Sequence, residues 1–596
     1  MRDHAKYCSW INTAGAVVFI LFSYWMTAIV RADMLFRGQE LSLFQFSSSF
    51  FADKMTQPAG FLEYAGRFLT QFFYYPWLGG LIFTGMLCLL AWMVYKAFGI
   101  DKNNALVSFL PSAALLLFVT QFDYTIYIVK HSDIFYMNLL GTMAALIPVM
   151  LCRTMHNRNC VVAVLLFMVA GYPLFGFYAL LGVITAAVCK RNKAVTATSI
   201  IAAATVPLAY HCIYHDCALK FMYIYGFPFR ALGTSVYLWI PLFADYLFII
   251  LLPALRGRLG VNVLRISQKA AIPLCIALVL TFSYRDSSFR KQLAIERAIH
   301  NGNWDLVLEK SSKPCKEQSR LICLYRNIAL FQKGVLLDEM FKYPYETSST
   351  LNTKNKRATY TEIGSTIIPF YYGLANNCYR WNMESLVNNG AYVSYYKNML
   401  LCSVLSGERQ LSQRYARQLS STLFYKKWAD RYIAYAFDGK LFAKDKTLNK
   451  VKALNTFDNV LGEDDVTMES TILFHYLETE PESLAQIEMS MGIALITKSN
   501  SDFWYCFEKY ANNAAVLPRH VQEAALMFGM FQDFDMEQIE RMCNRDVIKR
   551  FEQFTDLVRE YGNTGMSQEK VGRIAEKNFG DTYWYYYQFV NGEITN

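Results

Sequence analysis

The sequence has 596 residues, of which 54% are hydrophobic and 18% charged, and its net charge is +10. Soluble globular proteins contain about 25% charged residues, so this composition excludes a disordered chain, a coiled coil and an ordinary soluble enzyme. The first 283 residues contain 20 Lys and Arg against 10 Asp and Glu, whereas the rest of the chain is neutral. We therefore predict a membrane domain in residues 1–284 and a soluble domain in residues 285–596.

Apolar stretches near the length that crosses a bilayer, about 20 residues, recur through the first domain. The run Cys160–Cys189 is too long for one straight span, and it contains Gly171–Pro173, where proline interrupts a helix. It predicts two short segments that meet at Gly171–Pro173, either in a surface hairpin or beside a cavity open to the outer side. The sequence thus predicts a bundle of nine spans: Cys8–Val30, Trp77–Phe98, Ala105–Thr120, Ile134–Leu151, the two halves of Cys160–Cys189, Ala194–Ile213, Thr234–Leu255 and Gln268–Tyr284.

The placement of Lys and Arg orients these spans, because short cytoplasmic loops are enriched in both residues. With a cytoplasmic N-terminus and nine crossings, the inner loops hold 13 basic and 2 acidic residues, and the outer loops hold 7 of each. Counting the broken run as one crossing abolishes this asymmetry. We therefore expect the N-terminus to be cytoplasmic and the C-terminal domain to be extracytoplasmic.

From about residue 286 onward the hydrophobic spacing is helical and broken by short turns. The turn glycines Gly302 and Gly334 are 32 residues apart, close to the period of about 34 residues in tetratricopeptide repeats. Further helix pairs flank Gly407 and Ser499–Ser501, and residues 345–361 form a polar insert. The predicted fold class is therefore all-α: a polytopic transmembrane bundle followed by a soluble tetratricopeptide-like α-solenoid. Such solenoids bind protein partners.

The first external loop, residues 31–76, is rich in aromatic and charged residues. Leu62, Phe68 and Phe72–Phe73 indicate an amphipathic helix along the membrane surface. Glu63 and Arg67 are four residues apart, so we expect them to pair on the polar side of this helix. A helix that only packs against the bundle would show the same pattern.

Charged residues near the outer surface are candidates for a lipid-linked substrate site. Asp33 and Glu40 lie near the start of the loop, where a carboxylate can act as a base towards an acceptor hydroxyl or hold a divalent metal ion. Alternatively, each of these acids has no catalytic role and is only a polar residue at the membrane interface. Basic side chains can hold the phosphate of a polyprenyl carrier, and the candidates are Arg67, Lys130, Lys220 and Arg230.

Asp245 lies about midway along the apolar stretch Thr234–Leu255. Ionisable residues inside a membrane are costly and face a cavity or a partner. Asp245 is therefore a candidate for lining a substrate cavity or for proton coupling in a transporter. The structural alternative is a hydrogen bond to a neighbouring Tyr, Thr or backbone carbonyl.

Metal-binding patterns are weak in this sequence. His211, His215 and Asp216 form a loose metal-like triplet, for which interfacial histidines are the simpler explanation. The 14 cysteines show no paired spacing of the kind that zinc sites use. We therefore predict no metal site from the cysteine and histidine pattern.

Three stretches of the first loop resemble a known family: Gln39–Phe44 (QELSLF), Gln57–Tyr64 (QPAGFLEY) and Arg67–Gly79 (RFLTQFFYYPWLG). Together with the helical-repeat tail they resemble an uncharacterised family of bacterial multi-spanning membrane proteins, over most of the chain. This resemblance implies a multi-pass protein of the bacterial inner membrane. The architecture is similar to the GT-C class of glycosyltransferases. Those enzymes share a many-helix membrane domain, a long first external loop with a functional carboxylate near its start, and a soluble external C-terminal domain.

The resulting hypothesis is an inner-membrane protein of cell-envelope assembly, a GT-C-like transferase that uses a polyprenyl-phosphate-linked sugar donor. One rival is a non-catalytic membrane scaffold whose helical repeats bind envelope partners, and another is a transporter that uses Asp245. Duplicated halves would favour the transporter, and loop residues that converge on an outer cavity would favour the transferase. Membrane lipid, the lipid-linked donor and a protein are the expected partners. Nucleic acid is not expected, because the positive charge belongs to the inner face.

Overall fold

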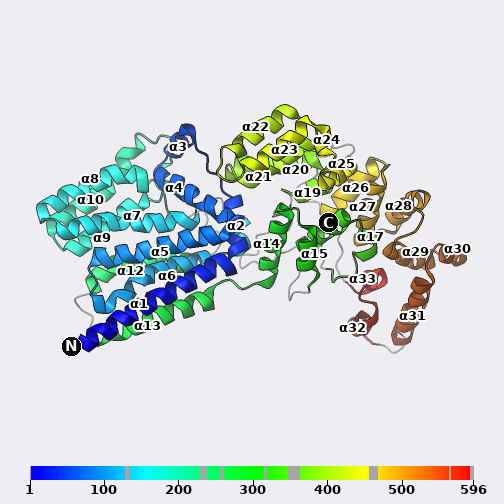
Figure 1. Ribbon diagram of the computed structural model, residues 1–596, viewed down its shortest axis with the longest axis horizontal. Coiled ribbons are helices and arrows are strands. Elements are labelled where there is room, and N and C mark those ends of the chain that lie inside the picture. The colour runs from blue at the N-terminus through cyan, green and yellow to red at the C-terminus, as the bar shows by residue number, and fades with distance from the viewer. Residues whose placement is uncertain are drawn as a thin grey trace. The chain divides into compact units, whose positions relative to one another are not determined.

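The computed structural model describes residues 2–127, 134–228, 238–255, 261–313, 319–345, 363–364, 366–455, 468–562 and 566–590. These ranges form an all-α structure without strands (Figure 1). The chain divides into two compact units. The membrane unit comprises Met1–Arg285, Asn389–Ser394 and Gln418–Lys426, and the C-terminal unit comprises Asp286–Asn388, Tyr395–Arg417 and Lys427–Asn596.

In the membrane unit, long apolar helices alternate with short helical turns. Apolar runs form helices in lipid because every backbone polar group must be satisfied inside its own segment. The elements are α1 (Arg2–Tyr24), the π-helical turn η1 (Trp25–Val30), α2 (Ala32–Glu40), α3 (Ser48–Lys54), α4 (Gly60–Thr70), η2 (Gln71–Tyr74), α5 (Pro76–Phe98), η3 (Lys102–Phe109), α6 (Leu110–Thr120), η4 (Tyr124–Tyr127), α7 (Ile134–Thr154), α8 (Asn157–Phe175), α9 (Phe177–Lys190), α10 (Lys193–His211), η5 (Leu219–Phe221), α12 (Trp239–Leu255) and α13 (Val261–Phe282).

Six helices in the described ranges are long and apolar enough to cross a membrane, or seven when Ala270–Phe282 is joined to the helix after it. The six are Trp10–Val30, Pro76–Phe98, Lys102–Thr120, Ile134–Thr154, Asn157–Phe175 and Lys193–His211. They indicate a multi-pass membrane protein. The other predicted spans also form helices, but α9 has 14 residues and α12 has 17, which is short for a bilayer. Nine crossings and their orientation stay predictions.

The break in the long apolar run lies at Gly176, not at Gly171–Pro173 as the sequence predicted. The helix α8 continues through Pro173 to Phe175, and Gly176 (φ 54°, ψ −125°) joins it to α9. Pro173 cannot donate a hydrogen bond to the carbonyl of Val169, four residues earlier. The hydroxyl of Tyr210, on α10, donates to that carbonyl instead, at 2.8 Å. The helix therefore tolerates the proline because a neighbouring helix replaces the lost hydrogen bond.

Small residues allow α7 and α9 to pack closely in the membrane unit. A Cβ atom on Gly141 of α7 would lie 2.3 Å from the ring of Tyr178, on α9. A Cβ atom on Gly182 of α9 would lie 2.8 Å from the carbonyl oxygen of Ala145. Small residues let membrane helices approach closely in this way, and the approach brings Tyr178 against α7.

Two later segments of the chain pack against the first external loop inside the membrane unit. Val393 donates its backbone N–H to the carbonyl of Ser42 at 3.1 Å, and Phe46 donates to the carbonyl of Ser421 at 3.3 Å. A predicted boundary at residue 284 does not anticipate these segments.

The C-terminal unit is made of shorter helices that pack in consecutive pairs, such as α14 with α15 and α27 with α28. Gly302, Gly334 and Gly407 follow α14, α16 and α21 and have left-handed φ values of 65°, 74° and 74°, as expected of glycines that end helices. The predicted insert 345–361 lies outside the described residues except for Tyr345.

The helices of this part of the chain are α14 (Ser287–His300), α15 (Trp304–Ser312), α16 (Arg320–Lys333), α17 (Leu336–Glu339), α19 (Ile368–Tyr371), α20 (Ala375–Asn389), α21 (Val393–Leu405), α22 (Arg409–Ser420), α23 (Lys426–Phe437), α24 (Gly439–Phe442), α25 (Lys446–Leu454), α26 (Met468–Glu478), α27 (Leu484–Ile496), α28 (Asn500–Asn513), α29 (Arg519–Phe531), α30 (Met536–Arg541), α31 (Arg545–Gly562), α32 (Gln568–Phe579) and α33 (Tyr583–Phe589). A buried bidentate ion pair between Arg320 and Glu469, with N–O distances of 2.7 Å, joins α16 to α26.

Candidate functional site

The first external loop begins at Arg31, a buried residue between η1 and α2. Its guanidinium donates to the backbone carbonyl of Thr120 at 2.7 Å and to that of Tyr284. The backbone N–H of Tyr284 donates to the same carbonyl of Thr120 at 3.0 Å. Arg31 therefore fixes the start of α2 to the end of α6 and to the chain after α13.

The helix α2 carries both predicted catalytic carboxylates on one face. Asp33 lies in its first turn and Glu40 is its last residue. Seven residues are nearly two helical turns, so the two acids lie on the same side, about 10.5 Å apart along the axis. Arg37 lies between them and pairs with Glu40 at 3.4 Å. Asp33 is half-buried, whereas Glu40 is buried.

Tyrosines surround this end of α2. Gln39 donates to the hydroxyl of Tyr425, which belongs to one of the two later segments of the membrane unit. The rings of Tyr74 and Tyr425 meet edge-on with their centroids 5.2 Å apart. The guanidinium of Arg37 lies over the ring of Tyr127, 4.9 Å from its centroid, an attractive cation–π arrangement.

The hydroxyls of Tyr425 and Tyr74 remain protonated. Burial, followed by the nearby charge of Glu40, raises the pKa of Tyr425 well above its ordinary value. The pKa of Tyr74 is raised by burial, by Tyr75 and by Glu40. Both hydroxyls are therefore neutral at physiological pH and can donate hydrogen bonds next to the carboxylate.

A second charged cluster surrounds Glu63 on α4. Its carboxylate accepts from Nε of Arg67 at 3.0 Å and from Nε2 of Gln57 at 2.8 Å, and Nζ of Lys54 lies 3.1 Å away. The predicted Glu63–Arg67 pair is confirmed. The helix α4 packs against α7 and α8, and Glu63 and Arg67 are only 8% and 7% exposed. The polar side of α4 is thus buried rather than facing water, and a phosphate at Arg67 would have to compete with Glu63.

Asp245 lies on α12 and is fully buried. Thr142 of α7 donates to its Oδ2 at 2.9 Å, and no described residue forms a hydrogen bond with Oδ1. Beside it, the hydroxyls of Tyr178 and Tyr246 are 2.9 Å apart, and Tyr178 donates to Oδ1 of Asn138 at 2.8 Å.

Of the other predicted phosphate ligands, only Lys220 is described. It lies in η5, is exposed, and its Nζ is 4.9 Å from the ring centroid of Phe221. Lys130 and Arg230 lie outside the described residues. The helix α10 ends at His211, so His211 and His215 do not share a helix. In the described part of the chain no three His, Cys, Asp or Glu residues are grouped to hold a metal ion.

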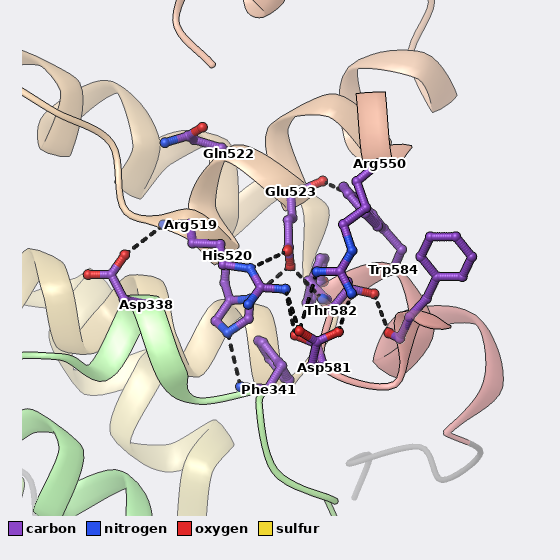
Figure 2. Close-up of polar contacts among 12 residues, drawn as sticks. Asp338, Phe341, Arg519, His520, Gln522, Glu523, Arg550, Asp581, Thr582 and Trp584 are labelled. Carbon is purple, nitrogen blue, oxygen red and sulfur yellow. Dashed lines mark hydrogen bonds and ion pairs between the residues drawn. The ribbon is translucent and has the colours of Figure 1, made fainter. Parts of the chain in front are cut away.

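The C-terminal unit contains a polar cluster at the start of α29, which the sequence did not indicate (Figure 2). His520 is buried; its Nδ1 lies 2.8 Å from Oε2 of Glu523, and its Nε2 accepts the backbone N–H of Phe341 at 3.3 Å. Glu523 also accepts the backbone N–H of Tyr583 at 2.7 Å and Nε of Arg519 at 2.9 Å. Both ring nitrogens of His520 are occupied, so this cluster holds helices together and offers no base for catalysis.

Asp581 lies at the edge of the same cluster, between two arginines (Figure 2). Arg519 approaches it at 2.9 Å and Arg550 at 2.5 Å. Burial alone would raise the pKa of Asp581, but the hydrogen bonds from Arg550 and Arg519 outweigh burial and lower it to about 2. Asp581 is therefore charged at physiological pH and links α29 to the chain before α33.

Arg37 and Tyr425 are the site residues that the sequence reasoning missed. Arg37 could have been found, because it is four residues after Asp33 and three before Glu40 on one helix. Tyr425 carries no local signal, because its partner Gln39 is 386 residues away.

No curated protein and no solved structure matches this chain. A family of unknown function, DUF6057, matches residues 6–590, which is nearly the whole chain. The multi-pass helical chain described above therefore belongs to the DUF6057 family of unknown function.

Proposed function

We propose that this protein acts in cell-envelope assembly as a GT-C-like glycosyltransferase that uses a polyprenyl-phosphate-linked sugar donor. The observation that carries the proposal is the ion pair between the buried Glu40 and the partly buried Arg37. It lies on a helix face that also presents Asp33, next to protonated phenols. A base, a phosphate-binding cation and hydrogen-bond donors are the groups that such a transfer needs.

In the proposed step, Glu40 accepts the proton of the acceptor hydroxyl. The hydroxyl oxygen forms a bond to the anomeric carbon of the sugar, while the bond from that carbon to the carrier phosphate breaks. The polyprenyl phosphate leaves with the electron pair of that bond, and Arg37 neutralises its charge. Lys220 and Arg67 remain proposed phosphate ligands, and Arg67 would act only after releasing Glu63.

The proposal includes nine crossings, a cytoplasmic N-terminus and an extracytoplasmic tetratricopeptide-like solenoid that binds an envelope protein. It rests on the excess of basic residues in the inner loops and on the pairwise packing of the C-terminal helices. A reporter enzyme that is active only outside the cytoplasm should work when fused after residue 596 and fail when fused after Asp101. Activity of a cytoplasm-specific reporter at residue 596 would contradict this topology.

The enzymatic proposal is tested by complementing a knockout strain and comparing its envelope glycans by mass spectrometry. Glu40→Gln keeps the shape of the side chain but removes the base, so transfer should fall by about 10²- to 10⁴-fold. Asp53→Asn is the matched control, because Asp53 lies in the same loop with its side chain 67% exposed, and it should restore the glycans fully. Wild-type glycans in the Glu40→Gln strain would rule out the carboxylate mechanism and favour the scaffold.

A further inference from the structure

The environment of Asp245 is unusual for a carboxylate. The side chain has no exposed surface and lies on α12, which packs against α6 and α9. Its one hydrogen bond in the described structure comes from Thr142, which donates to Oδ2 at 2.9 Å. Oδ1 is buried in the same place without a described partner. A charged carboxylate would need several donors or a cation to replace the water that it loses.

The neighbouring helices present no positive charge to Asp245 in the described structure. The cation of α7, Arg153, is eleven residues after Thr142 and donates to the carbonyl of Lys96 instead. The helix α6 has no acidic or basic residue. The titratable groups that face Asp245 are the phenols of Tyr178 on α9 and Tyr246 on α12, and their hydroxyls bond each other at 2.9 Å. Tyr136 lies on α7, six residues before Thr142. Its hydroxyl lies 3.4 Å from the carbonyl oxygen of Gly79 on α5 and so has a different partner.

The single cation of α9 lies at the far end of that helix. Lys190 donates to the carbonyls of Cys152 and Met155 at 3.1 Å and 2.6 Å. It is twelve residues after Tyr178, which is about 18 Å along a helix. Lys190 therefore cannot compensate a charge at Asp245.

We propose that Asp245 is a proton-binding site of the membrane unit and that the proton is bound at neutral pH. Thr142 already bonds Oδ2, so the proton resides on Oδ1. A neutral carboxylic acid costs much less to bury in an apolar helix bundle than a carboxylate with one hydrogen bond. The site is separate from Glu40, so it goes beyond the proposed function and does not depend on it.

This site makes stability depend on pH in a defined direction. In the unfolded chain the carboxyl of Asp245 meets water and loses its proton in the ordinary acidic range. The folded protein retains the proton to higher pH, so it binds more protons than the unfolded chain over that interval. Stability then falls as pH rises through that interval, because only the unfolded chain can release the proton there and solvate the charged carboxylate.

The test is thermal unfolding of the full chain in lipid nanodiscs, from mildly acidic to mildly alkaline pH. Asp245→Asn keeps the size of the side chain and cannot become charged, so it should abolish the loss of stability as pH rises from the acidic range. Thr142→Val removes the donor that favours the charged form, so the loss should begin at the same pH and continue to higher pH than in the wild type. Thr142→Ser keeps the hydroxyl and should behave like the wild type.

Infrared spectroscopy of the folded wild-type protein gives a direct readout that needs no comparison of stabilities. A carboxylic-acid C=O band at neutral pH that is missing from Asp245→Asn supports the proposal. An unchanged loss of stability with rising pH in Asp245→Asn, or no such band at neutral pH, would overturn it. Replacing K⁺ by Na⁺ should change nothing, whereas stabilisation by Na⁺ in the wild type but not in Asp245→Asn would show a sodium site instead.

Discussion

Asp581 shows how two arginines set the charge of a half-exposed carboxyl. Arg550 and Arg519 lower its pKa to about 2 against the effect of burial, from about 3.9 in an unfolded chain. A lowered pKa means that the interaction stabilises the fold above about pH 4 and is lost as pH falls towards 2. The side chain is 37% exposed, so solvent screening reduces the gain to about 1 kcal/mol.

Asp581→Asn should therefore remove about 1 kcal/mol of stability at neutral pH and flatten the loss of stability on the acidic side. The measurement is thermal unfolding of the purified full chain at neutral and at acidic pH. Asp556→Asn is the control, because its pair with Arg559, at 3.5 Å, has both side chains 74% exposed and should contribute little. An acid profile of Asp581→Asn that coincides with the wild type would contradict the assignment.

Contacts between residues close in sequence could be predicted, and contacts between distant residues could not. The Glu63–Arg67 pair follows from helical spacing alone. Asp581 pairs with Arg519, which is 62 residues away in the sequence. The residues next to either one therefore do not predict the contact. The same limit hides Tyr425 beside α2, and it also hides the burial of Arg67, which depends on α7 and α8.

At the scale of elements, the turn between α8 and α9 depends on one glycine. Gly176 has a φ of 54° with a ψ of −125°, a combination that L-residues with a side chain avoid. A Cβ atom there would lie 2.3 Å from the carbonyl oxygen of Tyr225, which also accepts the N–H of Phe177 at 2.7 Å. The turn therefore has neither the conformational freedom nor the space for a side chain.

Gly176→Ala should destabilise the protein by at least about 2 kcal/mol, since strain and steric overlap act together. Gly171→Ala is the matched control: it lies inside α8, and its added Cβ would meet only ring atoms at 3.5 Å. Alanine is a better helix former than glycine, so this variant should be neutral or more stable by up to about 1 kcal/mol. Thermal unfolding in detergent distinguishes them, and a harmful Gly171→Ala with a silent Gly176→Ala would place the turn at Gly171–Pro173.

Most membrane helices were predictable because their apolar runs are long. The position of the break in the long run was not, because the effect of Pro173 depends on the hydroxyl of Tyr210, on another helix. The position of a proline in the sequence shows which backbone carbonyl loses its hydrogen-bond donor, namely the one four residues earlier. Only the packing of α8 against α10 shows that the donor is replaced.

At the scale of the whole molecule, the difference in charge between the two parts of the sequence predicts a single boundary at residue 284. The compact units are not continuous in sequence, because Asn389–Ser394 and Gln418–Lys426 belong to the same unit as Met1–Arg285. The two later segments of the membrane unit were not predictable. Phe424 stacks on Tyr74 with ring centroids 5.2 Å apart, yet in the sequence it resembles any aromatic residue of a helical repeat. These segments complete the surroundings of Glu40, so the proposed site is not contained in the first 284 residues.

The central claim is that Glu40 is the base of a sugar transfer, and release of the carrier lipid measures it most directly. The purified full chain in nanodiscs would be mixed with polyprenyl-phosphate-linked sugars and with envelope material that carries the acceptor hydroxyl, both extracted from the knockout strain. Polyprenyl phosphate would be followed by mass spectrometry. The wild type and Asp53→Asn should release it at equal rates. Glu40→Gln should be slower by about 10²- to 10⁴-fold while unfolding at the same temperature as the wild type. Release by Glu40→Gln at the wild-type rate, or none by the wild type, would contradict the account.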